Sequence, residues 1–272
     1  MKSLLFVPGN NPSMLQNSFV FESDKVIIDL EDAVSVDNKD AARILVKQYL
    51  KICDRLEDVV IRINGLDTPY YIDDMKMLSE FDIYAVMVPK VTVEVMNEFN
   101  SKYNYKTIPI VESCIAVTQI NELVKFDNII GILLGGEDLS SDLEVARTAS
   151  SIEILYPRQQ LAYYCKAYNK LAIDTPTTNA TLMDVVYEDA TFAKEIGMKA
   201  KACIHPNQVN VINTVFRVSE EEILWAKRVM IAVKKNEGKG AFSLDGKMID
   251  EPIIKRAKRF LSESGIGGED IE

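Results

Sequence analysis

The sequence predicts an α/β fold in which eight parallel strands close into a (β/α)8 TIM barrel. The main observation is that eight short apolar runs, typical of strands buried on both faces, alternate along the chain with segments of helical character. The second is size, because 272 residues with 47% hydrophobic content can bury one large core. The alternative is an open doubly wound sheet. That fold usually has a G-x-G-x-x-G turn after its first strand, and Pro8-Gly9-Asn10 does not match it.

The predicted strands are short and rich in Val, Ile and Leu, as expected for strands that no solvent reaches. In chain order they cover residues 3–8, 25–30, 59–64, 85–88, 108–111, 129–138, 171–175 and 199–204.

Helices are predicted between these strands from capping and periodicity signals. Asn11 before Pro12 begins the first helix, and Asp37 is expected to cap the second. Ser219 and Glu222 form a capping box that opens a long helix after the eighth strand. The predicted helices cover residues 12–23, 38–55, 70–79, 93–100, a segment ending near 125, 158–169, 183–196 and the long helix ending before 238.

The chain is expected to have two parts. Residues 1–237 would form the catalytic barrel, and residues 238–272, with a last helix near 252–261, would form a C-terminal lid, an oligomerisation tail or a swapped arm. This extension lies beyond the eighth strand–helix unit, so the barrel does not need it for closure.

Charge and cysteine content limit the class of protein. A net charge of −10 and a pI of about 4.9 argue against nucleic acid or an anionic membrane as partner. Four widely spaced cysteines fit reduced thiols in the core, and no apolar run is long enough for a signal segment or a membrane span. We therefore expect a cytoplasmic protein.

The strand ends predict a metal site. The only histidine is His205, so a metal must be held mainly by oxygen, which favours Mg²⁺ or Mn²⁺ over Zn²⁺. In a barrel the carboxyl ends of the strands form the mouth, where Glu112 and Asp138 would end adjacent strands and hold the metal. As alternatives, Glu112 is only a helix first-turn acid, or the cations Arg62 and Lys90 merely neutralise the mouth's acids.

Other residues at the mouth have less certain roles. Arg62 suits a carboxylate or a developing enolate oxygen, or else pairs structurally with Glu31 or Asp32. Lys90 could form a Schiff base with a carbonyl substrate, although the acidic mouth favours its protonated form. Gly136 and Glu137 lie where the backbone could approach a substrate carboxylate closely, and we expect Glu137 to contribute its N–H group rather than its charge.

A series of motifs resembles the citrate lyase β-subunit (CitE-like) group of the HpcH/HpaI aldolase superfamily. They occur in the family's order over nearly the whole chain: LFVPG (5–9), IIDLEDAV (27–34), IRIN (61–64), VPKV (88–91), PIVES (109–113), GGEDLSSDL (135–143), EILYPRQQL (153–161), ACIHPNQV (202–209) and SLDGKMIDEP (243–252). Many relatives carry basic residues after the first strand, where this chain has Asn10 and Asn11. We therefore do not assign to this loop the contacts with a thioester carrier that those basic residues imply.

The resemblance implies a Mg²⁺-dependent carbon–carbon lyase that forms a homo-oligomer, a trimer or a hexamer. The substrate would be an acyl-CoA or acyl-carrier-protein thioester, with a citryl group first and a malyl-CoA or citramalyl-CoA lyase as alternatives. Other citrate lyase subunits could be partners. A Schiff-base aldolase and a non-catalytic binding subunit are weaker alternatives.

The family's site residues match particular positions of this chain. Its metal ligands fall on Glu112 and Asp138, its substrate-binding arginine on Arg62, and its lid aspartate on Asp250. For a retro-Claisen cleavage, Arg62 would stabilise the enolate and Asp250 would do acid–base work.

Overall fold

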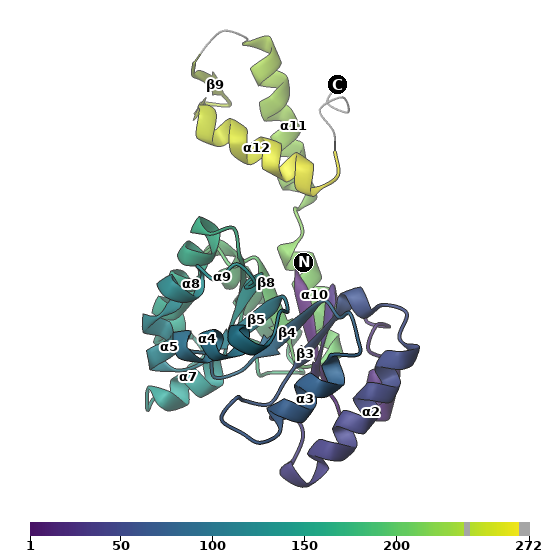
Figure 1. Cartoon of the computed structure of the whole chain (residues 1–272). Coiled ribbons are helices and arrows are strands. Elements are labelled where there is room, and N and C mark those ends of the chain that lie inside the picture. Colours follow the sequence, from purple (N-terminus) through teal and green to yellow (C-terminus); the bar gives the residue numbers. More distant parts are fainter. Residues whose placement is uncertain (237–239, 267–272) are drawn as a thin grey trace. The chain divides into compact units, whose positions relative to one another are not determined.

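The structure is a computed structural model that describes residues 1–236 and 240–266. The chain divides into two compact units, Met1–Phe216 and Arg217–Glu272 (Figure 1). The first unit is a closed barrel of eight parallel strands in chain order, so the predicted TIM barrel is confirmed. Its strands are β1 Ser3–Pro8, β2 Lys25–Asp29, β3 Val59–Arg62, β4 Ala85–Val88, β5 Thr107–Val111, β6 Gly131–Leu134, β7 Leu171–Asp174 and β8 Ala200–Cys203.

The barrel closes where β1 pairs in parallel with β8 as well as with β2. Leu4, for example, is in register with Lys25 on one side and with Ala202 on the other. Inside the barrel lies an apolar core of residues contributed by all eight strands, among them Ile27, Ile108 and Ile173. Larger clusters fill the layer between the barrel and its outer helices. The strands are therefore buried on both faces, which explains their unbroken apolar sequences.

Helices surround the barrel (Figure 1). They are α1 Pro12–Gln16, α2 Lys39–Ile52, α3 Tyr71–Leu78, α4 Val93–Lys102, α5 Cys114–Thr118, α6 Ile120–Leu123, α7 Gly136–Asp142, α8 Leu155–Ala167, α9 Met183–Glu195 and α10 Pro206–Phe216, with short 3-10 turns at Val36–Asn38, Leu56–Asp58 and Ile152–Ile154. No helix in residues 1–236 or 240–266 is both long and apolar enough to cross a membrane.

Two predictions about the early helices need correction. The side chain of Asn11 caps α1 as expected, by accepting from the N–H of Met14, but α1 is much shorter than predicted. Asp37 does not cap α2, because it lies within a preceding 3-10 turn and α2 begins only at Lys39.

The sixth strand also ends earlier than predicted. β6 stops at Leu134, and α7 begins at Gly136 after the single residue Gly135. The N–H of Gly135 still bonds to the carbonyl of Val111 at 2.9 Å, which extends the pairing of β6 with β5 by one residue before the chain turns. Glu137 and Asp138 therefore lie in the first turn of a helix and not at the end of a strand.

The division into units falls before the long helix and not after it. Because α10 already packs against β1 and β8, the barrel is complete at Phe216. The long helix, α11 Glu220–Lys235, belongs to the second unit with α12 Glu251–Glu263 and the hairpin strands β9 Phe242–Leu244 and β10 Lys247–Ile249. The predicted boundary after residue 237 is therefore about one helix too late.

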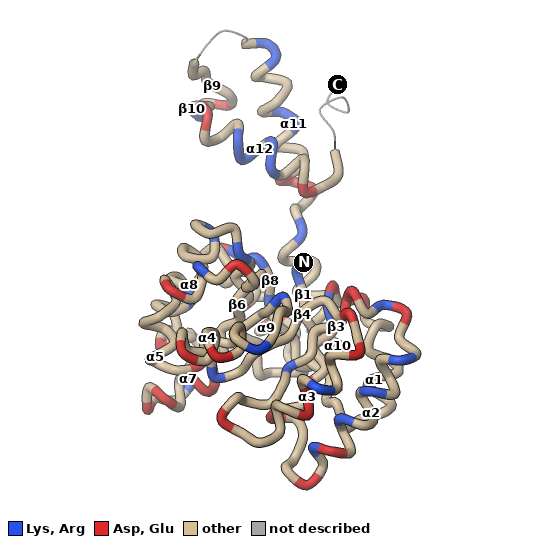
Figure 2. Tube along the Cα trace, viewed as in Figure 1, with Lys and Arg blue, Asp and Glu red and all other residues tan. Residues whose placement is uncertain are grey.

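The second unit has its own small core, formed by apolar residues of α11, α12 and β10 (Ala226, Val229, Ile249, Ala257 and Leu261). The predicted capping box of α11 is present in full. A run of Lys and Arg is exposed on α12, whereas the loops of the barrel unit carry many Asp and Glu residues (Figure 2). Residues 237–239 and 267–272 of the predicted tail lie outside the described residues.

The cysteine prediction is partly confirmed. All four thiols are free, as expected, and Cys165 and Cys203 are buried in the core. Cys53 and Cys114 are only half-buried, so the prediction of core positions is wrong for these two.

Candidate active site

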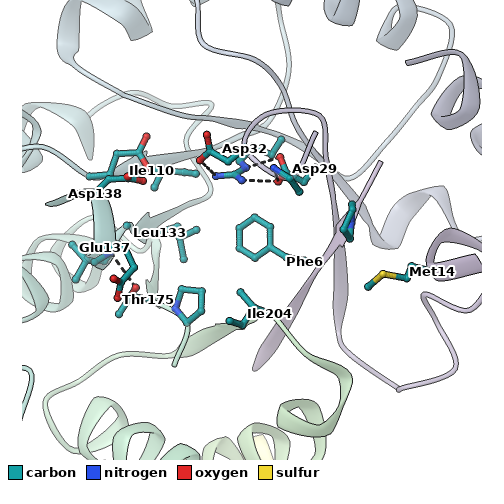
Figure 3. A pocket seen from close by; sticks show the side chains of 18 residues that line it. Phe6, Met14, Asp29, Asp32, Ile110, Leu133, Glu137, Asp138, Thr175 and Ile204 are labelled. Carbon is teal, nitrogen blue, oxygen red and sulfur yellow. Dashed lines mark hydrogen bonds and ion pairs between the residues drawn. The ribbon is translucent and has the colours of Figure 1, made fainter. Parts of the chain in front are cut away.

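A cavity of about 410 Å³ lies at the carboxyl ends of the barrel strands (Figure 3). It contains the predicted site residues Asp32, Arg62, Glu112, Gly136, Glu137 and Asp138. The cavity also has an apolar wall, formed by Phe6, Met14, Ile110, Leu133 and Ile204. The structure thus brings together most of the predicted site, and it adds an acid that the sequence analysis missed, Asp29.

Arg62, the last residue of β3, is held mainly by Asp29. Its Nε and Nη2 atoms lie 2.7 and 2.6 Å from the two carboxylate oxygens of Asp29. Its Nη1 lies 3.2 Å from Glu31 and 3.4 Å from Asp32. Burial opposes the charge of Arg62, but the hydrogen bonds and charge of Asp29 outweigh it and raise the pKa of the guanidinium. The predicted pairing with Glu31 and Asp32 exists, but as the weaker part of the arrangement.

Asp29 also orders the loop that follows β2. Its carboxylate accepts the N–H groups of Glu31 and Ala33 at 2.8 and 3.0 Å, in addition to the fork of Arg62. A carboxylate with this many donors is a fixed structural acceptor. The sequence feature that could have identified Asp29 is a charged residue at the end of the apolar run KVIID.

Glu31 is a buried acid with few partners. Only 6% of the residue is exposed, and neither of its carboxylate oxygens receives a hydrogen bond from any described residue. Burial raises its pKa to about 8, against the opposing effect of Arg62, and the neighbouring acids add to the rise. Glu31 therefore binds a proton near neutral pH when no further cation is close.

Glu112 follows β5 and is also buried. The N–H of Lys90 donates to Glu112 Oε1 at 2.5 Å. Burial raises the pKa of Glu112 to about 7, and the charge of Asp138 contributes to the rise while Arg62 opposes it. Glu112 and Asp138 line the same cavity, and their like charges repel.

The Gly135-Gly136 pair makes room for two side chains of the site. A Cβ on Gly135 would lie 2.5 Å from the Cβ of Glu112, and one on Gly136 would lie 2.9 Å from Oγ1 of Thr175. The N–H of Gly136 donates to that same Thr175 oxygen at 3.0 Å. This N–H is therefore engaged within the protein, and the substrate-binding role of Gly136 stays a prediction.

Glu137 and Asp138 differ although they are neighbours in the first turn of α7. The side chain of Glu137 pairs with Nε of Arg147 at 2.9 Å, which accounts for its charge within the protein. The N–H groups of both residues lie in the first turn, where no acceptor within the helix exists. That Glu137 contributes its backbone and Asp138 its carboxylate stays a prediction.

The donor set fits a hard divalent cation. Among residues 1–236 and 240–266, no group of three or more His, Cys, Asp or Glu side chains is arranged to hold a metal. Glu112 and Asp138 instead offer two carboxylates that line one cavity. Mg²⁺ is commonly bound in this way, by one or two carboxylates with waters and substrate oxygens completing its shell.

Other strand-end residues do not reach the cavity. Asp174, the last residue of β7, is fully buried beside Arg158 and Lys201 in the layer outside the barrel. Alternation along β7 explains this, because Ile173 and Thr175 point inward and Asp174 points outward. Nδ1 of His205 accepts the N–H of Asn207, in agreement with a structural role.

Asp250, the predicted acid–base residue, belongs to the second unit. It precedes α12, and its carboxylate caps that helix by accepting from the N–H of Ile253 at 3.3 Å. Its catalytic role stays a prediction.

Comparison with known proteins places this site in a family. The family model for HpcH/HpaI aldolase/citrate lyase matches residues 2–206. The chain is 34% identical to the citrate lyase subunit beta of Leuconostoc mesenteroides subsp. cremoris, an alignment that covers 96% of this chain and 92% of the relative. It is 27% identical to the mitochondrial citramalyl-CoA lyase of Homo sapiens, with 94% and 83% covered.

A solved structure agrees over nearly the whole chain. The protein CitE from Mycobacterium tuberculosis, in complex with magnesium, acetoacetate and coenzyme A, superposes with a TM-score of 0.87. The two sequences are 28% identical, and the match covers 97% of this chain and 98% of that one. The chain therefore belongs to the HpcH/HpaI aldolase/citrate lyase family.

Proposed function

We propose that this protein is a Mg²⁺-dependent carbon–carbon lyase that cleaves a β-hydroxyacyl thioester by retro-Claisen chemistry. The substrate we propose is a citryl thioester on CoA or an acyl-carrier protein, which would yield oxaloacetate and an acetyl thioester. The observation that carries the proposal is that Glu112, Asp138 and Arg62 line one cavity at the catalytic end of a family barrel.

Glu112 and Asp138 would hold the metal. When bound, Mg²⁺ supplies a Lewis acid that lowers the pKa of a nearby hydroxyl and offsets the acidity of the mouth. Support comes from the oxygen-only donor set and from relatives named as magnesium complexes. A bound cation would stabilise the carboxylate form of Glu112 and so oppose the effect of burial on its pKa.

Arg62 would stabilise the negative charge that develops during cleavage. Removal of the β-hydroxyl proton allows the carbon–carbon bond to break, which leaves a keto acid and a thioester enolate. Nε and Nη2 of Arg62 are committed to Asp29, so Nη1, which faces only longer contacts, is the edge available to the enolate oxygen. Asp29 keeps the guanidinium oriented, and such fixed charge is effective because it needs no reorganisation.

A proton must finally be returned to the enolate carbon. We propose Asp250 for this acid–base step, because the motif SLDGKMIDEP (243–252) resembles the family's segment that carries the lid aspartate. The second unit would then act as a lid or as an arm shared between copies of the chain. Assembly into a homo-oligomer or with other citrate lyase subunits belongs to the same proposal, supported by relatives named as subunits. The free cysteines fit a reducing compartment such as the cytoplasm.

A citramalyl-CoA or malyl-CoA lyase is the second candidate. The apolar wall of the cavity, which includes Phe6, Leu133 and Ile204, would suit the methyl group of a citramalyl substrate. Relatives named citramalyl-CoA lyase are similar over most of their length.

A substrate panel separates these candidates. Purified protein with Mg²⁺ would be offered citryl-CoA, malyl-CoA and citramalyl-CoA, and also a citryl group on an acyl-carrier protein. Release of oxaloacetate, glyoxylate or pyruvate would identify the acyl group, and EDTA is expected to abolish it. Turnover that survives EDTA and is trapped by borohydride at Lys90 would instead indicate a Schiff-base aldolase.

A further inference from the structure

Thr175 is a buried residue of the cavity to which no role has been assigned so far. It follows β7 directly, only 2% of it is exposed, and it lines the cavity close to Glu137 and Leu133 (Figure 3). In the closed barrel, β7 lies opposite β3, the strand that carries Arg62. A ligand in the cavity therefore has Arg62 on one side and Thr175 on the other.

The hydroxyl of Thr175 accepts a hydrogen bond but donates none to the described residues. Its oxygen accepts the N–H of Gly136 at 3.0 Å. Among the described residues, no acceptor is found for its own hydrogen. Two neighbouring buried hydroxyls differ in this respect, since Thr177 donates to Asp189 at 2.6 Å and Ser140 donates to the carbonyl of Gly136 at 2.8 Å. Because Thr175 lines the cavity, a ligand bound there can supply the acceptor for this hydrogen.

The position of Thr175 is fixed from two directions. Its carbonyl oxygen accepts from Nζ of Lys201 at 2.6 Å, and the preceding Asp174 is clamped by Arg158 with two contacts of 2.8 Å. Its side chain is β-branched and packs against Gly136, where a Cβ would leave no room. The hydroxyl is therefore presented in a preorganised position, which is what a binding site for a small ligand requires.

We propose that Thr175 is a substrate-binding residue whose hydroxyl donates a hydrogen bond to a carboxylate or carbonyl oxygen of the bound acid. The ligand class is a keto acid, such as oxaloacetate or pyruvate, or the matching part of a β-hydroxyacyl thioester. The proposal rests on the proposed lyase function for the identity of the acid. Arg62 and Thr175 together would hold the acid across the barrel mouth and orient the bond that breaks.

The test compares Thr175→Val, which keeps the shape and removes the hydroxyl, with Thr175→Ser, which keeps the hydroxyl. The dissociation constant of oxaloacetate, and of pyruvate, would be measured by calorimetry on the protein loaded with Mg²⁺. Loss of a hydrogen bond to a charged acceptor predicts roughly 10- to 100-fold weaker binding for Thr175→Val. Thr175→Ser is expected to stay within about threefold of the unaltered protein, because it restores the donor.

Binding of Mn²⁺ alone separates this role from a structural one. Thr175→Val also removes the acceptor for Gly136, and a merely structural effect would disturb the turn that carries Asp138. In that case Mn²⁺ and keto acid would lose affinity together, and the proposal would be overturned. We expect Mn²⁺ affinity to change by less than about twofold, a much smaller effect than the loss of one hydrogen bond to the acid.

Thr177→Val is the matched control, because it removes a buried hydroxyl two residues away that does not line the cavity. It is expected to lower thermal stability and to leave keto-acid binding unchanged. If Thr175→Val does not fold, Thr175→Ala takes its place in the same comparison. Unchanged keto-acid affinity in the hydroxyl-free variant would overturn the role of Thr175 alone. Failure of the unaltered protein to bind any keto acid would overturn both this role and the proposed function.

Discussion

Two clusters of charged side chains in the same barrel differ in their charge balance. In the layer outside β7 and β8, Arg158 and Lys201 face Asp174 and Asp189, so two cations meet two carboxylates. Burial opposes the charge on Asp189, but Lys201 and Arg158 outweigh it and hold its pKa well below the usual range. Apart from one guanidinium nitrogen of Arg158, this cluster is satisfied by its own members.

The cluster at the barrel mouth is unbalanced. Arg62 faces Asp29, Glu31 and Asp32, and Nζ of Lys90 lies 3.8 Å from Glu31. Glu112 and Asp138 line the same cavity, so the acids outnumber these two cations. Burial raises the pKa values of Glu31 and Glu112 to about 8 and about 7. The comparison indicates that the balanced cluster stabilises the fold, whereas the unbalanced one is built to receive a cation and an anionic substrate.

The largest effect is expected from breaking the balanced cluster. Lys201→Met leaves two buried carboxylates against one guanidinium, which should cost about 3–5 kcal/mol of unfolding free energy. Chemical denaturation monitored by circular dichroism measures it. The control is Lys125→Met, which removes an exposed lysine paired with Glu122 and should change stability by at most about 1 kcal/mol. Similar losses of stability in the two variants would contradict the stabilising role of the balanced cluster.

Removing a carboxylate from the unbalanced cluster should affect turnover and not folding. Asp138 is exposed in the first turn of α7, so Asp138→Ala is expected to melt near the temperature of the unaltered protein. Its turnover should fall at least about 10²–10³-fold, the typical loss for one electrostatic contact to the transition state. Keto-acid release and a thermal melt on the same sample give both numbers. Near-normal turnover would refute the assignment of Asp138.

The raised pKa of Glu31 predicts a pH-dependent stability in EDTA. Since this pKa rises from 4.5 in the unfolded chain to about 8, the stability that Glu31 contributes is present below pH 4.5 and is lost as the pH rises through 8. Glu31→Gln has no carboxyl group to ionise, so the variant does not lose this stability at high pH. It should therefore melt above the unaltered protein at pH 8.5, by roughly 2–4 °C for each kcal/mol relieved, with the difference vanishing near pH 5. A variant that melts lower at pH 8.5 would show that the ionised acid is stabilising.

The smallest effect is expected at the neighbour of Asp138. Glu137→Gln keeps the backbone of the first turn and weakens only an exposed pair with Arg147, which is worth little. Turnover within about threefold of normal would agree with a backbone role. A loss as large as that of Asp138→Ala would show that the charge of Glu137 is required.

Much of this architecture could be predicted because burial leaves a strong pattern in sequence. The strands are buried on both faces, so their apolar runs, and with them Arg62 and Glu112 near the strand ends, could be located without coordinates. Asp29 was missed because it is the last residue of the run KVIID and therefore reads as part of a strand. Only the three-dimensional register, which sets Asp29 opposite Arg62, reveals its part in the site.

Other errors have a common physical origin in local turns. Gly135-Gly136 reads as the flexible end of a strand, but α7 begins there because glycine permits close packing against Glu112 and Thr175. The unit boundary was misplaced because α11 has a helical pattern like the others, and only packing shows that α10 already completes the barrel. The hydroxyl of Thr175 had no signal in the sequence, since its importance depends on which hydrogen-bond partner is absent.

The central claim is that Glu112 and Asp138 form one divalent cation site in the unbalanced cluster. Titration of Mn²⁺ by electron paramagnetic resonance tests it directly, with the unaltered protein, Asp138→Asn and Glu137→Gln measured under the same conditions. We predict one bound Mn²⁺ per chain, at least about tenfold weaker binding in Asp138→Asn, and unchanged binding in Glu137→Gln. Equal affinity in all three proteins, or no binding by the unaltered protein, would contradict the account.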